Sequence, residues 1–394
     1  MDRTPQVFVV AGEPSADQHG AMLGEALRRR CQVRLTGVGQ RRMRDAGFEL
    51  RFDSTGWSGI GVVQSLSRVP MLMVRMHQLT IHLVSVRPDL LVLMDFGAFN
   101  VRLARRLRRE LTSPILYYFP PRSWSRDADY RTLRGVVDRV ATPFPWSEGR
   151  LREAGIDARW VGHPVIDRIE PAHGEGRVRL RRELGLNAET PLVGMLPGSR
   201  SAEVRCNGPV MLGAAKLIIR DVPEMRFLLS VAPSIPRRLL ERQVDRAGLT
   251  DRVLLLEGVS EIVRAADMVV SSAGTATLEA AAALCPMVII YRGTWLMRLE
   301  RLLRRFRVDS VGMPNIVAGE RVVPELIGGE ARPSCVAAAA LALLGDEPRR
   351  AAVVRGLQRV RDRLGEPGVS DRVAAMASEM MGADLEADDQ LRKD

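Results

Sequence analysis

Residues 7–30 read VFVVAGEPSADQHGAMLGEALRRR. The first five residues are an unbroken apolar run, which is typical of a strand that is buried on both faces of a parallel sheet. A glycine, acidic residues and a serine follow, and after them comes a stretch with helical spacing that ends in three arginines. A strand, a polar turn and a helix in this order predict one unit of a layered α/β fold.

The same unit recurs along the chain, in two series separated by a polar stretch near 163–190. We expect strands at Val7–Ala11, Val33–Thr36, Leu90–Met94, Ile115–Tyr118, Val137–Ala141 and Arg159–Val161, and then at Leu192–Leu196, Met225–Val231, Val253–Leu256, Met268–Ser271 and Met287–Tyr291. The sequence therefore predicts two doubly wound, Rossmann-like domains facing a cleft. A ligand is expected at the carboxyl ends of their strands.

The predicted domains divide the chain into three parts. An N-terminal domain covers residues 1–165 and a C-terminal domain covers 166–350. Helices over 351–394 are expected to pack back toward the N-terminal domain and to end in a frayed tail.

The composition is that of an ordinary globular protein, with 394 residues, 46% of them hydrophobic, and a mean hydropathy of −0.04. The four cysteines lie far apart and lack metal-ligand spacing, which favours a reducing compartment and no metal site. The apolar run near the N-terminus is too short for the core of a signal peptide, and no uncharged apolar run is long enough to span a membrane. We therefore expect a cytoplasmic protein.

The net charge is +11, because 58 basic residues face 47 acidic ones. This excess predicts attraction to nucleic acid, to a phosphorylated substrate or to an acidic membrane surface. Nucleic acid is not an expected partner, since the chain has no nucleic-acid-binding motif and only 5% aromatic residues. Only Lys216 and Lys393 are lysines, and codon bias explains that preference for arginine better than function does.

Polar residues follow two strands of the first half. Glu13 and Ser15 come after the first strand, where they could cap a helix or bind a sugar. Asp95 directly follows the apolar strand Leu90–Met94. Partial burial there would raise its pKa toward the range of a general base, although an N-cap role is the simpler alternative.

Two strands of the second half end in phosphate-binding chemistry. Gly198, Ser199 and Arg200 offer a close backbone approach, hydrogen-bond donors and a guanidinium at a helix start. The second segment, 272–279, reads SAGTATLE and supplies amides, hydroxyls and a glutamate suited to a ribose diol. Together they predict a nucleoside-diphosphate site in which arginine and helix dipoles neutralise the leaving group without a metal.

Several motifs taken in order resemble one known family. They are AGEPSAD at 11–17, Asp95 with FN at 99–100, GHP at 162–164, LPGSR followed by AEV at 196–204, SAGTATLE at 272–279, and YR followed by MPNIVAGE at 291–320. Their order and spacing are similar to those of bacterial lipid-A-disaccharide synthases, glycosyltransferase family 19. The resemblance covers roughly residues 7–380.

The resemblance implies a GT-B hexosyltransferase that works by inversion, without metal or cofactor. It implies transfer of 2,3-diacylglucosamine from its UDP conjugate to 2,3-diacylglucosamine 1-phosphate, which forms a β-1,6 disaccharide and releases UDP. The partners would be the UDP-sugar donor, the acylated acceptor and an anionic membrane surface, and a homodimer is left open.

The resemblance also assigns residues to roles. It makes Asp95 and Arg200 catalytic, with Asp95 as the base for the acceptor hydroxyl. The nucleotide-sugar residues are Gly198, Ser199, Arg200, Ser272, Gly274, Thr275, Glu279, Arg292 and Asn315. The acceptor-side residues are Gly12, Glu13, Ser15 and Asp17.

The acceptor half departs from the family pattern at Pro14, Ala16, Ala98 and 120–127. These departures leave open a related transferase with a different lipid acceptor. A UDP-sugar 2-epimerase and a non-catalytic relic that only binds UDP are further alternatives.

Two segments combine apolar and basic residues. Residues 295–307, WLMRLERLLRRFR, have an apolar face and an arginine face at helical spacing. Residues 66–87 are mostly apolar with scattered basic residues, and they correspond to the region that forms the mouth for acyl chains in the family. We therefore expect peripheral association with the inner membrane.

Overall fold

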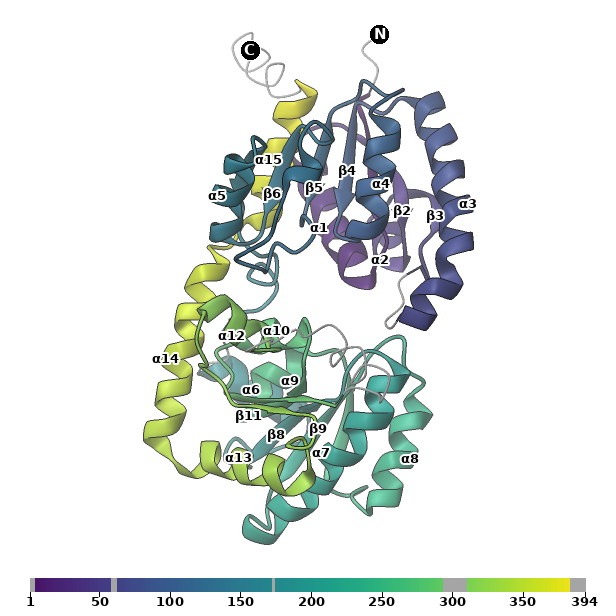
Figure 1. The fold of residues 1–394 in the computed structure, drawn as a ribbon. Coiled ribbons are helices and arrows are strands. Elements are labelled where there is room, and N and C mark those ends of the chain that lie inside the picture. Colours follow the sequence, from purple (N-terminus) through teal and green to yellow (C-terminus); the bar gives the residue numbers. More distant parts are fainter. Residues whose placement is uncertain (1–3, 58–61, 172–173, 293–309, 383–394) are drawn as a thin grey trace. The chain divides into compact units, whose positions relative to one another are not determined.

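Two parallel sheets form the centres of two units. The computed structural model describes residues 4–57, 62–171, 174–292 and 310–382 (Figure 1). The first unit contains the chain up to Asp167 together with Leu364 onward, and the second contains Arg168–Arg363.

The first unit has a seven-stranded sheet in the order β3-β2-β1-β4-β5-β6-β7, with every pair parallel. Its elements in chain order are β1 (Gln6–Ala11), α1 (Pro14–Arg30), β2 (Arg34–Gly39), α2 (Arg41–Asp45), β3 (Glu49–Asp53), α3 (Val62–Val86), β4 (Leu90–Met94), α4 (Gly97–Leu107), β5 (Ile115–Tyr118), the 3₁₀ turn η1 (Arg131–Leu133), β6 (Arg139–Thr142), α5 (Pro145–Glu153), β7 (Asp157–Trp160) and α15 (Val369–Met381).

The second unit has a six-stranded parallel sheet in the order β10-β9-β8-β11-β12-β13. Its elements are α6 (Glu175–Glu183), β8 (Leu192–Leu196), α7 (Ser201–Asp221), β9 (Arg226–Val231), α8 (Arg237–Ala247), β10 (Val253–Glu257), α9 (Ser260–Ala265), β11 (Met268–Ser272), α10 (Ala276–Ala282), β12 (Met287–Tyr291), α12 (Met313–Ala318), β13 (Glu325–Ile327), α13 (Pro333–Gly345) and α14 (Glu347–Leu364).

Both sheets reverse their strand order at one point. In the first sheet the chain moves outward from β1 through β2 to β3, then returns to place β4 on the other side of β1. In the second sheet β8 and β11 are related in the same way. Such switch points leave a crevice at the carboxyl ends of the two neighbouring strands, which is where ligands bind in open α/β sheets.

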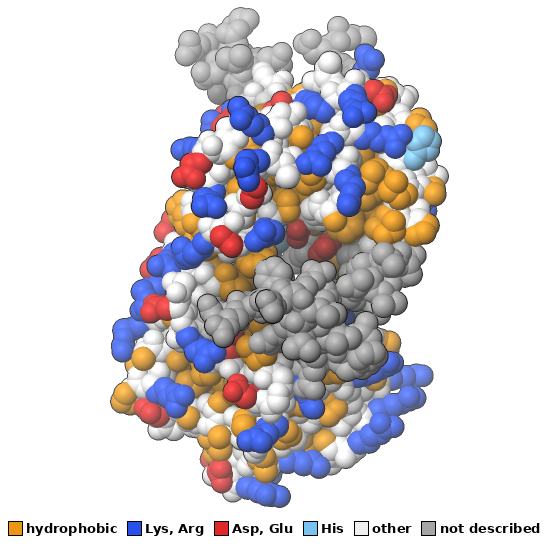
Figure 2. Space-filling view, viewed as in Figure 1, with side chains coloured by type: hydrophobic (Ala, Val, Ile, Leu, Met, Phe, Trp, Pro, Cys, Tyr) orange, Lys and Arg blue, Asp and Glu red, His pale blue; other side chains and the backbone are white. Residues whose placement is uncertain are grey.

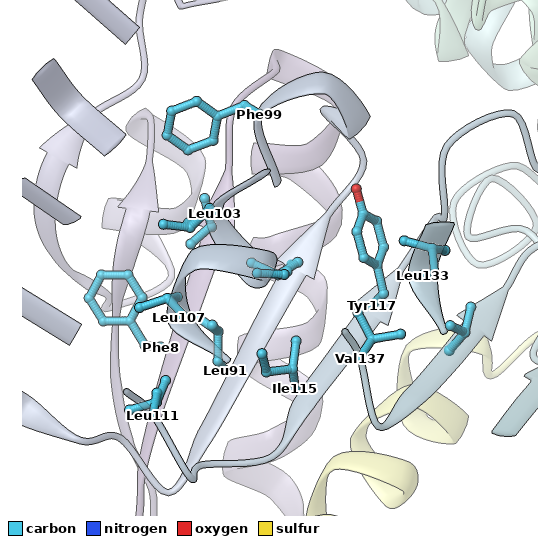
Figure 3. Close-up of a cluster of buried hydrophobic side chains, with 14 of the residues drawn as sticks. Phe8, Leu91, Phe99, Leu103, Leu107, Leu111, Ile115, Tyr117, Leu133 and Val137 are labelled. Carbon is cyan, nitrogen blue, oxygen red and sulfur yellow. The ribbon is translucent and has the colours of Figure 1, made fainter. Parts of the chain in front are cut away.

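The core of the first unit lies on both faces of its sheet. Successive side chains of β1 pack on opposite faces of the sheet, because side chains alternate in direction along a strand. Phe8 packs in the cluster under α4, drawn in Figure 3, whereas Val7 and Val9 pack in the cluster under α1 and α15. Burial on both faces explains why the strands read as continuous apolar runs.

The expected strands are present, and the structure adds β3 and β13 at sheet edges. β3 has the sequence ELRFD and no fully buried residue, so it lacks the apolar run by which the other strands were found. β13 has only three residues. Edge strands are solvated on one side and need little apolar sequence.

The C-terminal helices belong to different units. Residues 351–363 of α14 lie in the second unit, in place of the predicted packing toward the N-terminal domain. The physical reason is local: a Cβ at Gly356 would be 2.7 Å from the Cβ of Val322, and Arg363 donates to the carbonyl of Val317 at 2.9 Å. Only α15 packs in the first unit, against α1. The predicted frayed tail lies outside the described residues beyond Met381–Gly382.

Candidate functional site

The candidate residues of the first unit lie after β1 and β4, the two strands that flank its switch point, with Ser15 and Asp17 in the first turn of α1. Gly12, Glu13, Ser15 and Asp17 follow β1, and Asp95 follows β4. The two strands pair directly, with Ala11 opposite Met94. The fold therefore brings the predicted acceptor loop and the predicted base to the same crevice of the sheet.

The backbone at Asp95 is unusual. Asp95 has φ 47° and Phe96 has φ 45°, so two consecutive residues with side chains adopt the left-handed conformation. Each such residue costs about 1–3 kcal/mol and persists only where the surroundings fix it. Strain of this kind concentrates at functional sites, which marks this turn as a candidate site independently of the sequence.

The side chain of Asp95 is half-buried. Burial raises the pKa of its carboxyl above the ordinary value of 3.8, and the hydrogen bond from the backbone of Phe96 opposes the shift. A carboxylate of raised basicity is a better proton acceptor near neutral pH.

Close packing ties two other loops to this turn. A Cβ at Gly12 would lie 2.4 Å from the ring of Phe96, so a larger residue there would displace that ring. A Cβ at Gly97 would lie 2.5 Å from the side chain of Pro121. The loop after β4 is therefore fitted against the loops after β1 and β5.

The acceptor-side residues divide into two groups. Glu13 is the N-cap residue of α1, and both Glu13 and Ser15 are half-buried. Asp17 is 3% exposed, and its carboxylate accepts hydrogen bonds from the amides of Gln40 at 2.5 Å and Arg42 at 3.1 Å, near the start of α2. The structure thus uses Asp17 to anchor α2.

The departures from the family pattern fit the local structure. Pro14 occupies the first turn of α1, where its missing N–H leaves no helical bond unmade. Ala16 is 2% exposed and packs in the apolar cluster under α1. Ala98 is exposed in the first turn of α4.

An aromatic cluster at the ends of β5, β6 and β7 was not found from the sequence as a group. His19 stacks on Phe119 with ring centroids 5.1 Å apart, and His163 meets the same ring edge-on at 5.3 Å. Phe144 lies 5.8 Å from His163. The residues come from four separate segments, so no local pattern could have revealed them. The positive φ of Phe119, 61°, has no signature in the sequence either.

Most candidate residues of the second unit lie after β8 and β11, which flank its switch point, whereas Arg292 follows β12 and Asn315 lies in α12. Gly198 has φ 119°, and a Cβ there would be 2.4 Å from Oε2 of Glu203. Arg200 is the N-cap residue of α7 and is exposed. Its Nη1 donates to Oε1 of Glu203 at 2.9 Å, and such exposed pairs contribute little to stability. The guanidinium can therefore exchange this partner for an anion at small cost.

The loop after β11 presents the second group. Ser272 is buried at the strand end, and Gly274 and Thr275 are exposed before α10. Glu279, within α10, is 9% exposed, and its Oε2 lies 3.7 Å from Arg168. Arg292 follows β12 and is exposed.

Asn315 is buried, and its side-chain amide is hydrogen-bonded within the second unit. It is 2% exposed, and its Nδ2 donates to the carbonyl of Val323 at 2.9 Å and to Oε1 of Glu325 at 2.6 Å. Its Oδ1 accepts from the amides of Val322 at 2.7 Å and Val323 at 2.9 Å. The side chain links α12 to the segment before β13 and to β13 itself, and its predicted contact with the nucleotide sugar stays a prediction.

We expect Asn315→Ala to lower the free energy of unfolding by at least about 2 kcal/mol, because it leaves several buried polar groups without partners. Denaturant unfolding and hydrogen exchange at the amides of Val322 and Val323 measure the effect, with the exposed Asn187→Ala as the control. Unchanged stability and exchange together with lost donor binding would instead support direct contact with the ligand.

Outside this site, the described part of the chain has a cavity but no cluster of metal-binding side chains. Within the described residues, no group of three or more His, Cys, Asp or Glu side chains is arranged to hold a metal ion. A cavity of about 480 Å³ in the second unit is lined by Arg177, Asp267, Cys285 and Arg350 among others. Asp267 and Cys285 precede β11 and β12, so this cavity lies at the amino ends of the strands.

The outer face of α3 is apolar. Val69, Met73, Val74 and Ile81 are between 46% and 58% exposed, and Figure 2 shows hydrophobic side chains gathered over this helix. None of the helices in the described ranges is long and apolar enough to cross a membrane. The second predicted membrane segment, 295–307, lies outside the described residues.

Two arginines lie over the ring of Phe52, and one of them, Arg75, belongs to α3. The guanidinium of Arg75 lies 4.9 Å from the ring centroid of Phe52, and that of Arg51 lies 5.4 Å from it.

Comparison with known proteins shows the family. The model of the lipid-A-disaccharide synthetase family matches residues 7–379. The lipid-A-disaccharide synthase of Syntrophus aciditrophicus (strain SB) is 37% identical over 374 residues, which make up 94% of this chain and 96% of the relative.

Two solved structures share the fold at low sequence identity. UDP-GlcNAc 2-epimerase from Neisseria meningitidis, bound to UDP-GlcNAc, has a TM-score of 0.62 at 13% identity and covers 95% of this chain and 100% of its own. Sucrose-phosphate synthase from Thermosynechococcus elongatus has a TM-score of 0.58 at 16% identity and covers 97% of this chain and 100% of its own. These likenesses confirm the predicted GT-B type of fold. Because the family match extends over nearly the whole sequence, the chain belongs to the lipid-A-disaccharide synthetase family of glycosyltransferases.

Proposed function

We propose that this chain transfers 2,3-diacylglucosamine from its UDP conjugate to 2,3-diacylglucosamine 1-phosphate, forming the β-1,6 disaccharide of lipid A and releasing UDP. The observation that carries the proposal is the position of the family's motifs. AGEPSAD and Asp95 in the first half follow β1 and β4, and LPGSR and SAGTATLE in the second half follow β8 and β11, so each of these two pairs lies at a switch point.

The first unit would bind the acceptor and supply the base. Gly12, Glu13 and Ser15 would contact the acceptor beside Asp95, and Asp17 accepts hydrogen bonds from the amides of Gln40 and Arg42 near the start of α2. Asp95 would remove the proton from the acceptor's 6-hydroxyl as the oxygen attacks the anomeric carbon. Its raised pKa suits this role, and the proton ends on the carboxylate.

The second unit would bind the donor. Gly198 and Ser199 would let backbone amides approach the diphosphate, and Arg200 would pair with its oxygens. Ser272, Gly274 and Thr275 would contact a phosphate, and Glu279 the ribose. Arg292 would add a further positive charge, and Asn315 would position the segment after α12.

The bond changes balance with these residues alone. The acceptor oxygen forms a bond to the anomeric carbon, the bond from that carbon to the diphosphate oxygen breaks, and the configuration inverts. The electron pair of the broken bond leaves with UDP. Arg200 would stabilise that developing charge more strongly than the charge of the bound donor, which is the condition for a rate effect.

An assay with defined substrates tests the proposal. The full chain is incubated with UDP-2,3-diacylglucosamine, with and without 2,3-diacylglucosamine 1-phosphate or another acylated acceptor, and the products are identified by mass spectrometry. We expect UDP and disaccharide only with the phosphorylated diacyl acceptor. Product with another lipid alone would show a related transferase, a 2-epimer from donor alone would show an epimerase, and UDP binding without turnover would show a relic.

We also propose that the first unit contacts an anionic membrane surface through α3. The exposed apolar side chains would enter the headgroup boundary while Arg51 and Arg75 meet acidic lipids. An acylated acceptor resides in such a membrane, so this face would place the unit at its substrate. The location would be the cytoplasmic face of the inner membrane.

The double variant Met73→Ser, Val74→Ser should bind anionic vesicles at least about tenfold more weakly, because it removes apolar area from the contact. Sedimentation with vesicles of phosphatidylglycerol and phosphatidylethanolamine measures the binding. Leu254→Ser, which changes a 40% exposed leucine on β10, is the matched control. Equal binding by the double variant and the unchanged chain would refute the role of α3.

A further inference from the structure

Two buried side chains converge on the backbone carbonyl of Asp95. Oη of Tyr117 donates to this oxygen at 2.7 Å, and Nδ2 of Asn100 donates to it at 2.9 Å. The same Nδ2 also donates to the carbonyl of Met94 at 3.0 Å. A turn is closed by backbone hydrogen bonds, so two side-chain donors on one of its carbonyls are additional contacts. Both come from elements outside the turn, Tyr117 from β5 and Asn100 from α4.

The carbonyl they hold belongs to the left-handed turn. Asp95 and Phe96 are the two consecutive residues with φ of 47° and 45°. A change of Asp95 to the extended or helical conformation would rotate the peptide that follows it and carry its carbonyl away from both donors. The two hydrogen bonds therefore stabilise this conformation against the ordinary ones.

Neither donor is placed to touch a substrate. Tyr117 and Asn100 are 0% exposed, and Figure 3 shows the Tyr117 ring among the apolar side chains of the sheet face. Burial, together with the nearby Asp95 charge, raises the pKa of the Tyr117 phenol well above its ordinary value, so the hydroxyl keeps its proton at working pH. It is a permanent donor.

The turn is also fixed from its outer side. The amide of Asp95 donates to the carbonyl of Tyr118 at 3.1 Å, and the ring of Phe96 fills the space over Gly12. The direction in which the Asp95 side chain leaves the backbone is thus determined by contacts on both sides of the peptide. A displaced side chain would lose alignment with the acceptor hydroxyl, and alignment of this kind has large effects on rate.

We propose that Tyr117 and Asn100 are positioning residues that hold the peptide after Asp95 in its left-handed conformation and so aim the Asp95 carboxylate at the acceptor hydroxyl. This inference rests on the proposed role of Asp95 as the base. In their absence the turn would sample ordinary conformations in which the carboxylate is misdirected. The fraction of molecules ready for proton transfer would fall, while the donor site on the second unit would be unaffected.

The test begins with Tyr117→Phe, which removes only the hydroxyl and retains the buried ring. We expect kcat to fall about five- to tenfold, as the loss of one hydrogen bond implies, with KM for the donor within about twofold. Asn100→Ala should lower kcat further, because it removes the donor to two carbonyls. Tyr118→Phe is the matched control: it lies next on β5, is 1% exposed, and its hydroxyl has no hydrogen-bond partner in the described part of the chain.

A double-mutant cycle separates positioning from general destabilisation. In an Asp95→Asn background the residual rate should be unchanged by Tyr117→Phe, because the misdirected group no longer acts as a base. The acid limb of the pH profile of kcat/KM should also move in Tyr117→Phe, since the surroundings of the carboxylate change. Thermal unfolding of each variant checks that the fold is retained.

The outcomes distinguish the inference from its premise. Full activity of Asp95→Asn would refute the proposed base and leave nothing to position. An inactive Asp95→Asn combined with a fully active Tyr117→Phe would overturn the positioning role alone. An equal loss of rate from Tyr117→Phe in both backgrounds would do the same, because it would show an effect that does not pass through Asp95.

Discussion

Asp95→Asn is expected to lower kcat by about 100- to 10,000-fold, the usual contribution of a positioned base. The amide has nearly the same shape as the carboxylate but cannot accept the acceptor's proton. The affinity for UDP should be unchanged, because UDP would bind in the loops after β8 and β11 of the second unit. Steady-state kinetics and isothermal titration with UDP measure the two quantities, and near-normal turnover would refute the proposed mechanism.

The pH dependence follows from the shifted pKa of Asp95. Burial raises the pKa of this carboxyl above 3.8, so protonation begins at a higher pH than for an exposed aspartate. Since the base must be ionised, kcat/KM should fall as the pH decreases through that raised pKa. A profile whose acid limb lies at the ordinary aspartate value would contradict the assignment.

The raised pKa of Asp95 also predicts how stability depends on pH: activity should increase as the pH rises, whereas the free energy of unfolding should decrease. A carboxyl whose pKa is raised in the folded state binds more protons there than in the unfolded chain, so the free energy of unfolding decreases as the pH rises through the shifted range. Asp95→Asn removes that effect. Its melting temperature at pH 7 should therefore equal or exceed that of the unchanged chain, and the difference should shrink at lower pH. A loss of activity with retained stability separates a catalytic role from a structural one.

Arg200→Ala is the second large effect, with an expected loss of about 100- to 1,000-fold in kcat/KM, as for removal of a donor to a developing anion. Arg200 is exposed, and its ion pair with Glu203 is weak, so the folded state should lose little stability. Weaker UDP binding should accompany the slower rate, because the guanidinium would contact both bound and departing diphosphate.

Two variants control for Arg200. Arg205→Ala removes an exposed arginine on the same helix, α7, and should leave kcat/KM unchanged. Arg200→Lys keeps the charge but loses the paired donors, so it should recover only part of the activity. Equal loss in Arg200→Ala and Arg205→Ala would show that net charge on α7, and not a specific contact, determines donor binding.

Much of the fold could be predicted from local patterns. The apolar runs of β1, β4 and β8 are long because these strands are buried on both faces, and that burial is what makes them visible in a sequence. β3 and β13 were missed because edge strands carry little apolar sequence. The boundary within the C-terminal helices was missed because it depends on which core α14 and α15 bury against, and helical periodicity does not specify that partner.

In the candidate site, too, local patterns predicted some properties and only tertiary packing determined the others. The motifs placed Asp95 and Arg200 at strand ends, and the structure places those ends at switch points. The hydrogen bonds that Asp17 and Asn315 accept from backbone amides were not predicted, because a polar side chain in a motif has the same sequence signature whether it faces a ligand or a backbone amide. Only the coordinates show that the carboxylate and the amide are already occupied.

By itself the sequence determined the layered α/β class, the two series of units and the residue types available at each strand end. These properties are local, since they depend on hydrophobic period and on turn chemistry between neighbours in the chain. The tertiary structure decided which loops meet, that Asp95 adopts a left-handed conformation, and that Tyr117 and Asn100 hold it there. These properties depend on contacts between residues distant in the sequence, such as Tyr117 with Asp95 and Phe96 with Gly12, and such contacts exist only once the strands are paired.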